Sequence, residues 1–349
     1  EPVMCPHSPE QLTDALTRQG LSPVRLTTDR GSAVVVPELG GRVLSVVLDG
    51  VECLWRDPRV PVDYRAPGWN AGGQRTWVAP EHAPHSLFYR STEWSCPPEL
   101  DPGGFTVSDR AGSASVRLES RFRLSPQGRA STFALTRRIR VAAAGDGFRL
   151  QVAQRVAVPQ AETPARPYGA WAILQVPVPG LTVVALRRRT GTVPVFRDDF
   201  FEPLPDAWHA RGDGWATFRL TGDRQFKVGL RADALPARSR VDYFHPLAGS
   251  GRWLRIVQRT AIKRDGRYAD VPGGRPSPSG DAVQFYNHRA VPPLAYGEIE
   301  AHGPAGGAGQ PSNLSVSYDF HLLSPRQLRT LHGRAPWWHG LERATVPAE

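Results

Sequence analysis

Short runs of β-branched or alternating apolar residues recur along most of the sequence, separated by glycine, proline and aspartate. Runs of this kind, bounded by turn residues, are typical of β-strands, so we predict an all-β fold. The 34 glycines and 34 prolines supply turns and edge positions and argue against long helices. The clearest predicted strands are SAVVVPEL, RVLSVVLDG, ASVRLESRFRL, FALTRRIRVAAA, FRLQVAQRVAV, LTVVALRRR, FKVGLRA, RWLRIVQRTAI and LSVSYDFHLL.

Two short helices are predicted near the termini, and both begin with the same capping device. Ser8 and Ser324 each precede a proline, and a glutamine follows three positions later. A serine N-cap, a proline at the first helical position and a glutamine at the third form a capping box. We therefore expect one β domain over 24–323, with a helical segment before it (1–23) and a helix and tail after it (324–349).

The net charge of +10 first suggests an anionic partner. Only Lys227 and Lys263 are lysines, however, and the arginines that make up the rest are spread along the sequence. Such a spread is more typical of a solvated basic surface than of a nucleic-acid site, so we expect no nucleic-acid partner, while an acidic sugar stays open. No apolar run approaches the roughly 20 residues of a membrane-spanning helix, and we expect no membrane span.

Three cysteines, Cys5, Cys53 and Cys96, lack the close spacing of a zinc or redox motif. We expect one disulfide and one spare thiol. The sequence starts at Glu1 rather than methionine, which suggests a secreted or periplasmic protein whose signal peptide has been removed, with a cytoplasmic location as the alternative. The sequence does not predict an oligomeric state.

The first candidate site lies in GWNAGGQRTWVAPEHAPH, residues 68–85. Arg75 follows a glycine pair and stands between Trp69 and Trp77, and an arginine fork beside aromatic faces suits a sugar, which has apolar C–H patches ringed by hydroxyls. A turn with two core tryptophans is an equally good interpretation. Glu81 and His85 are acid–base candidates in the same stretch. The prolines around them exclude the helix of a zincin motif, so we expect no metal and no cofactor.

The second candidate site lies in LAYGEIEAHGP, residues 294–304. If 296–301 is a strand, its period of two puts Glu298 and Glu300 on one face, in line with Tyr296 and His302, while Ile299 faces the core. One strand face would then carry a tyrosine, two glutamates and a histidine. The alternative is a row of solvent-facing side chains, which is the commoner arrangement for an arbitrary strand.

The order of several short motifs resembles the galactose mutarotase-like superfamily, and within it an uncharacterised branch related to aldose 1-epimerases. The motifs are GGQRTWVAPE (72–81), GWATFRL with FKVGL (214–230), and EIEAHGP before LSVSYDFHLL. The resemblance covers most of 24–323 and implies a large antiparallel β-supersandwich that binds a sugar or oligosaccharide in a concave cleft.

The resemblance also implies roles for individual residues. In the epimerases a glutamate base near the C-terminus lies in an L-E-x-Q-like strand motif, which 299–302 resembles, so Glu300 inherits the base role. Arg75 resembles the arginine that binds sugar hydroxyls. Tyr296, Glu298, Trp69, Trp77, Glu81 and His85 are then candidate substrate contacts.

One departure from the family concerns the acid. The epimerases keep a histidine acid near the middle of the sequence, in an H-x-Y-x-N-like motif, and the corresponding region here, 166–180, contains no histidine. His245 and His288 are the substitutes by residue type, although neither occupies the position of the motif.

Three functions follow from these observations. The leading hypothesis is a mutarotase or epimerase-like enzyme that uses acid–base catalysis. The second is a carbohydrate-binding protein that has lost the acid and does not catalyse. The third is a polysaccharide lyase, which the positive charge would suit, although the sequence leaves no room for the additional helical domain that such lyases usually carry.

Overall fold

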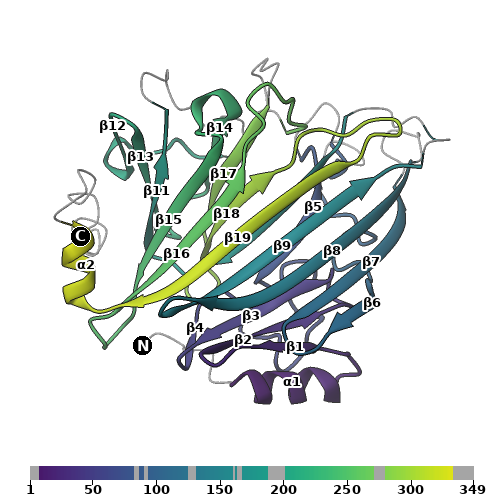
Figure 1. The fold of residues 1–349 in the computed structure, drawn as a ribbon, viewed down its shortest axis with the longest axis horizontal. Coiled ribbons are helices and arrows are strands. Elements are labelled where there is room, and N and C mark those ends of the chain that lie inside the picture. Colours follow the sequence, from purple (N-terminus) through teal and green to yellow (C-terminus); the bar gives the residue numbers. More distant parts are fainter. Residues whose placement is uncertain are drawn as a thin grey trace.

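Two large antiparallel sheets form the protein in the computed structural model, which describes residues 8–81, 86–89, 93–124, 131–159, 162, 167–187, 201–270 and 280–332 (Figure 1). The nine-stranded sheet has the order β1-β2-β3-β5-β10-β18-β17-β14, with β4 paired to β3. The ten-stranded sheet has the order β12-β13-β11-β15-β16-β19-β9-β8-β7-β6. The all-β prediction is therefore confirmed.

The strands of the nine-stranded sheet are β1 (Val24–Thr27), β2 (Gly31–Val36), β3 (Arg42–Leu48), β4 (Val51–Glu52), β5 (Gln74–Ala79), β10 (Gly169–Val176), β14 (Phe226–Arg231), β17 (Asp281–His288) and β18 (Tyr296–His302). Those of the ten-stranded sheet are β6 (Thr106–Ala111), β7 (Ser115–Leu124), β8 (Ser131–Ala144), β9 (Gly147–Ala157), β11 (Gly180–Ala185), β12 (His209–Gly212), β13 (Trp215–Leu220), β15 (Arg238–Pro246), β16 (Trp253–Ala261) and β19 (Ser312–Leu323). Two short 3₁₀ helices are η2 (Asp206–Trp208) and η3 (Ala232–Ala234).

The two predicted helices are present as α1 (Pro9–Arg18) and α2 (Pro325–His332), near the N- and C-termini respectively (Figure 1). Ser8 and Gln11 form the predicted capping box, in which the side-chain oxygen of each residue accepts a hydrogen bond from the backbone N–H of the other. Ser324 and Gln327 repeat it at α2. No helix within the described ranges has the length and apolar character needed to cross a bilayer.

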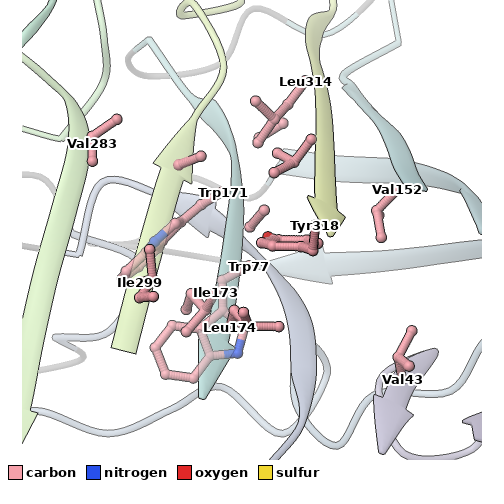
Figure 2. Close-up of a cluster of buried hydrophobic side chains, with 14 of the residues drawn as sticks. Val43, Trp77, Val152, Trp171, Ile173, Leu174, Val283, Ile299, Leu314 and Tyr318 are labelled. Carbon is pink, nitrogen blue, oxygen red and sulfur yellow. The ribbon is translucent and has the colours of Figure 1, made fainter. Parts of the chain in front are cut away.

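One hydrophobic cluster joins the facing sides of both sheets (Figure 2). Leu174 and Ile299 of the nine-stranded sheet belong to it together with Val152, Leu314 and Tyr318 of the ten-stranded sheet. Burial of apolar side chains on this scale is the main stabilising term for such a sandwich. The packing leaves the opposite side of the nine-stranded sheet for polar residues.

Cys53 and Cys96 are both free thiols in the structure. The expected disulfide is therefore not formed between these two cysteines, and Cys5 lies outside the described residues. Burial raises the pKa of both thiols, so neither carries the thiolate that reacts with oxidants.

A buried ion pair anchors the segments that precede and follow β5. Arg42 on β3 donates to both carboxylate oxygens of Asp101, at 2.8 and 2.7 Å, and to the carbonyl of Trp69 at 2.9 Å. Asp101 also accepts a hydrogen bond from Trp77 Nε1 at 2.9 Å. Both charged side chains are at most 2% exposed. Removing one partner would leave an uncompensated buried charge.

We predict that Asp101→Ala lowers the free energy of unfolding by about 3–5 kcal/mol, because Arg42 would stay buried without its carboxylate. Urea unfolding followed by tryptophan fluorescence measures this loss. Asp233→Ala is the matched control, since Asp233 pairs with Arg231 at the surface, and it should cost less than about 1 kcal/mol. Equal effects of the two substitutions would contradict the assigned role of the Arg42–Asp101 pair.

Candidate functional site

Five neighbouring strands of the nine-stranded sheet carry polar side chains on the side that faces away from the ten-stranded sheet. On β5, Thr76 hydrogen-bonds to Gln154 of β9, so its side chain points to the ten-stranded sheet and that of the adjacent Arg75 points away. Residues paired across antiparallel strands point to the same face of the sheet. The strand register therefore identifies the residues of β10, β18, β17 and β14 that lie on the same face as Arg75. We call its central members the polar face: Arg75, Gln175, Lys227, Gln284, Tyr286, Glu298 and Glu300.

The strand β18 supplies the two carboxylates of the polar face. Glu298 is 4% exposed and Glu300 is fully buried, and their neighbours in line, Tyr296 and His302, are buried as well. Ile299 lies in the hydrophobic cluster between the sheets, as predicted. The solvent-facing alternative for this row is therefore wrong. Trp55 packs on Tyr296, and Arg75 and Lys227 reach the two glutamates from other strands.

Arg75 is bound to Glu298 in an ion pair at 2.8 Å. The second guanidinium nitrogen donates to Asn70 Oδ1 at 3.2 Å, and Gln175 Nε2 donates to both Glu298 at 3.0 Å and Asn70 at 2.8 Å. The guanidinium also lies over the Trp69 and Trp77 rings, at 5.0 and 4.1 Å from their centroids. Arg75 thus holds Glu298 in place in addition to any contact with a ligand.

The glycine pair before Arg75 is required by close packing of the backbone. Gly73 has a φ of +78°, and a Cβ there would lie 2.2 Å from the carbonyl oxygen of Val43. Gly72, with a φ of +95°, would bring a Cβ within 2.5 Å of the Arg56 Cα. Only glycine fits this left-handed, crowded turn. The two glycines thus allow the close approach of neighbouring main chain.

Glu300 is surrounded by three nitrogen-bearing side chains. Trp171 Nε1 of β10 donates to Glu300 Oε2 at 2.8 Å, and Lys227 Nζ of β14 lies 3.3 Å from the same oxygen. His302 Nε2 lies 3.9 Å from it, with its ring stacked on Trp171. Lys227 also bonds to Glu81 Oε2 at 2.8 Å. One carboxylate oxygen of Glu300 is therefore fixed by donors from two other strands.

Burial dominates the electrostatics of this cluster. It raises the pKa of Glu300 to about 8, with Lys227 acting in the opposite direction and Glu298 adding to the rise. Burial also raises the pKa of Glu298, against the lowering effect of Arg75. Although burial alone lowers the pKa of Lys227, the carboxylates of Glu300 and Glu81 raise it more, so Lys227 stays protonated. Glu300 thus gains and loses its proton near neutrality.

Three acceptor oxygens on the polar face have no hydrogen-bond partner among the described residues. They are the Oε1 atoms of Glu300, Gln284 and Gln175. Gln284 pairs with Glu300 in register, and Gln175 pairs with Glu298. The amide donors of both glutamines are already used, since Gln284 Nε2 bonds to Asp270 at 2.8 Å and Gln175 Nε2 bonds to Glu298. Buried acceptors normally find a donor. The polar face is suited to a ligand that donates hydrogen bonds, such as one carrying several hydroxyls.

The aromatic candidates of the first site are part of a packed cluster. Trp77 is 2% exposed and contacts Phe88, Trp94 and Trp171, while the partly buried Trp69 packs on Trp77 and Trp94. Figure 2 shows Trp77 and Trp171 close together near Ile173. For Trp77 the structure therefore supports the core interpretation. On β18, Tyr296 is buried between the rings of Trp55 and His288.

The structure separates the two histidines that were candidates for the acid. His288 lies on β17, four residues after Gln284, which pairs with Glu300 in register. Its Nδ1 is 3.1 Å from the Tyr286 hydroxyl. His245 lies on β15 of the ten-stranded sheet, where its Nδ1 is 2.8 Å from the carbonyl oxygen of Pro179. Of these two, only His288 shares a sheet with Glu300. His85 lies outside the described residues.

Two residues that touch Glu300 were not identified as candidates from the sequence. Lys227 lies in the short apolar run FKVGL. It is one of only two lysines in a sequence rich in arginine, and this rarity was the feature of the sequence that could have identified it. Trp171 lies in the region where the family resemblance implies an acid histidine, and the absence of that histidine was the sequence signal. Within the described ranges, no group of three or more His, Cys, Asp and Glu side chains is arranged to hold a metal ion.

The sequence matches no family model and no curated protein. Among solved structures, a candidate aldose 1-epimerase from Escherichia coli is similar over 87% of this protein and 100% of its own length, with 12% identity and a TM-score of 0.56. A galactose mutarotase related enzyme from Lactobacillus acidophilus is similar over 87% of this protein and 99% of its own length, with 11% identity and a TM-score of 0.51. The protein therefore has the galactose mutarotase-like fold, as the sequence motifs predicted.

Proposed function

We propose that the protein binds a sugar on the polar face and interconverts its anomers or epimers by acid–base catalysis, with Glu300 as the base. The observation that carries this proposal is the state of the Glu300 carboxyl group. Trp171 and Lys227 hold one oxygen, the other has no partner in the described structure, and the pKa is raised to about 8. A base is most effective when its pKa lies near the working pH.

A sugar is the ligand class that the other polar groups support. The acceptor oxygens of Gln175 and Gln284 lie on the same face as Glu300 and need donors, which sugar hydroxyls supply. The names of the structurally similar proteins, a candidate aldose 1-epimerase and a galactose mutarotase related enzyme, point to the same substrate class. At 11 and 12% identity they support the choice through the fold alone.

We assign the acid to His288, because it lies on the same side of the same sheet as Glu300. His288 lies four residues along β17 from Gln284, the register partner of Glu300. Four residues of a strand span about 13 Å at about 3.3 Å per residue. Glu298 and Tyr286 lie between the two groups on the same face, so a sugar ring that contacts both would lie over these side chains. His302 directly contacts Glu300 and leaves no room for a sugar ring, and His245 lies on the other sheet.

Replacement of the base tests the proposal directly. We predict that Glu300→Gln lowers the rate of anomer interconversion by about 100-fold or more, because general acid–base groups contribute on this scale. Polarimetry or NMR exchange with a panel of aldoses and hexuronic acids measures the rate above the spontaneous one. Sugar affinity should survive, since the amide keeps the shape of the side chain. An unchanged rate would exclude Glu300 as the base.

The ionisation of Glu300 gives a second prediction that does not depend on turnover. In wild-type protein, the infrared absorption of protonated carboxyls should fall with a midpoint near pH 8, and the difference from Glu300→Gln isolates the part due to Glu300 from that of Asp281, whose pKa burial also raises to about 8. Lys227→Met removes the neighbouring positive charge and should move the midpoint upward by about one unit or more. Lys227→Arg keeps the charge and serves as the control. A midpoint near the ordinary glutamate value would contradict the described environment.

The second candidate function is sugar binding without catalysis, and Trp171 is the observation that favours it. Trp171 occupies β10 beside Glu300, in the region where the resemblance implies the acid histidine, and an indole N–H donates a hydrogen bond but does not transfer a proton. The epimerase proposal predicts turnover of at least one sugar that binds in calorimetry. Binding without turnover of any sugar in the same panel would establish the second function instead.

A further inference from the structure

The outward side of the ten-stranded sheet carries a broad field of arginines. The alternation of buried and exposed residues along β7, β8 and β9 puts apolar side chains toward the core and the arginines outward. The register extends the field across β19 to β16 and β15. We call this surface the arginine face, and its arginines are Arg117, Arg121, Arg123, Arg138, Arg140, Arg149, Arg155, Arg238, Arg240, Arg255 and Arg259.

Few acidic groups balance this charge on the same surface. Asp319 accepts from both Arg149 and Arg259, and Asp242 accepts from both Arg240 and Arg255. Glu119 pairs with Arg117 at 3.0 Å, and Asp109 of β6 lies opposite Arg117 in register. The Glu162 carboxylate, which accepts hydrogen bonds from Thr132, also interacts with the charges of Arg121 and Arg123. The arginine face therefore retains a large positive excess, most of it on β7, β8 and β9.

The arrangement places like charges directly opposite each other. Arg117 pairs in register with Arg138, and Arg240 pairs with Arg259. Like charges opposite each other across two strands are unfavourable for a sheet. Glu119 compensates Arg117, and Asp242 and Asp319 compensate Arg240 and Arg259, so among these four arginines the uncompensated charge is that of Arg138, which a bound polyanion would neutralise.

A cavity of about 420 Å³ lies at one edge of the arginine face. Arg121 and Arg155 line it together with Ala134, Ala157, Val158 and Pro311. The volume lies in the range of pockets that hold small ligands. Two cationic forks beside an apolar wall suit a sugar unit that carries a carboxylate or sulfate, because its C–H face can contact the alanine, valine and proline side chains.

The shape and composition of the face favour a polysaccharide over the other polyanions. Six neighbouring strands at about 4.8 Å spacing give a width of about 24 Å, so a small anion would contact only part of the charge. Proteins that bind single-stranded nucleic acid stack bases on aromatic side chains. Within the described parts of β7, β8, β9 and β19, the outward positions hold no phenylalanine, tyrosine or tryptophan, and the outward Phe244 of β15 and Trp253 of β16 pack with Leu328 of α2.

We propose that the arginine face binds an acidic polysaccharide, with one of its charged sugar units in the cavity between Arg121 and Arg155. This site lies on the opposite sheet from Glu300 and does not depend on the function proposed for the polar face. Binding at this site would attach the protein to an anionic polymer, independently of which small sugar binds to the polar face.

The test is direct binding of two acidic polysaccharides, polygalacturonate and heparin, with neutral dextran as the uncharged control. We expect binding of at least one acidic polymer, no binding of dextran, and an affinity that falls steeply with salt, as it does when several charge contacts release counterions. The bound polymer should also raise the melting temperature. Binding of neither acidic polymer at low ionic strength would overturn the proposal.

Paired variants separate the site from the overall net charge. Arg121→Gln with Arg155→Gln, at the cavity, should weaken binding about tenfold or more, and Arg138→Gln with Arg140→Gln should reduce the salt dependence. Arg18→Gln with Arg65→Gln, on α1 and in the segment beside it, removes the same charge away from the face and should leave the affinity within about twofold. An equal loss in this control, or an intact affinity in the cavity variant, would contradict the assignment.

Two further ligands decide the class of partner. Single-stranded DNA and vesicles containing anionic lipid present similar charge without sugar rings that carry acid groups. The proposal predicts that both bind more weakly than the preferred polysaccharide at equal salt. Tighter binding of either one, with the same dependence on Arg121 and Arg155, would replace the polysaccharide as the partner.

Discussion

The burial of charge on the polar face is the constraint on which the arrangement of the nine-stranded sheet depends. Glu298 and Glu300 are removed from water, and an isolated buried carboxylate costs several kcal/mol. The compensating cations come from both sides: Arg75 from β5, across β10, and Lys227 from β14, across β17. The strand order from β5 to β14 is thus the order that brings both cations to β18, and a shift in register would separate the charges.

The two sheets use their charges in opposite ways. On the polar face, charged groups are buried, paired and few, so each contact fixes the geometry of its neighbours and the pKa of Glu300 departs from its ordinary value. On the arginine face, the charges are mostly exposed and unbalanced, and water and salt screen their repulsion. The shared hydrophobic cluster keeps these two surfaces on opposite sides of the molecule. The sugar site proposed on the polar face and the polymer site proposed on the arginine face therefore share no residue.

The sequence predicted what depends on local pattern. The period of two in β18 placed Tyr296, Glu298, Glu300 and His302 in one line, and the serine–proline–glutamine pattern located both helices. It could not predict the partners of Glu300, because Trp171 and Lys227 are far from it in sequence and reach it only through strand pairing. The same limit explains His245, since residue type alone does not tell which of two sheets a strand joins. The surroundings of Glu298 also include Asn70, which is far from it in sequence and accepts hydrogen bonds from Arg75 and Gln175 beside it.

The Trp171–Glu300 hydrogen bond connects the two functions proposed for the polar face. A donor on one oxygen stabilises the carboxylate and orients it, which leaves the second oxygen for a ligand hydroxyl. Desolvation acts in the opposite direction and makes the carboxyl a stronger base than an exposed glutamate. Lys227 sets the balance, because loss of its positive charge would raise the pKa of Glu300 further and favour the protonated form, which does not act as a base. A sugar-binding site and a base are thus the same arrangement of atoms, and what separates them is whether a second group gives a proton to the opposite side of the ring.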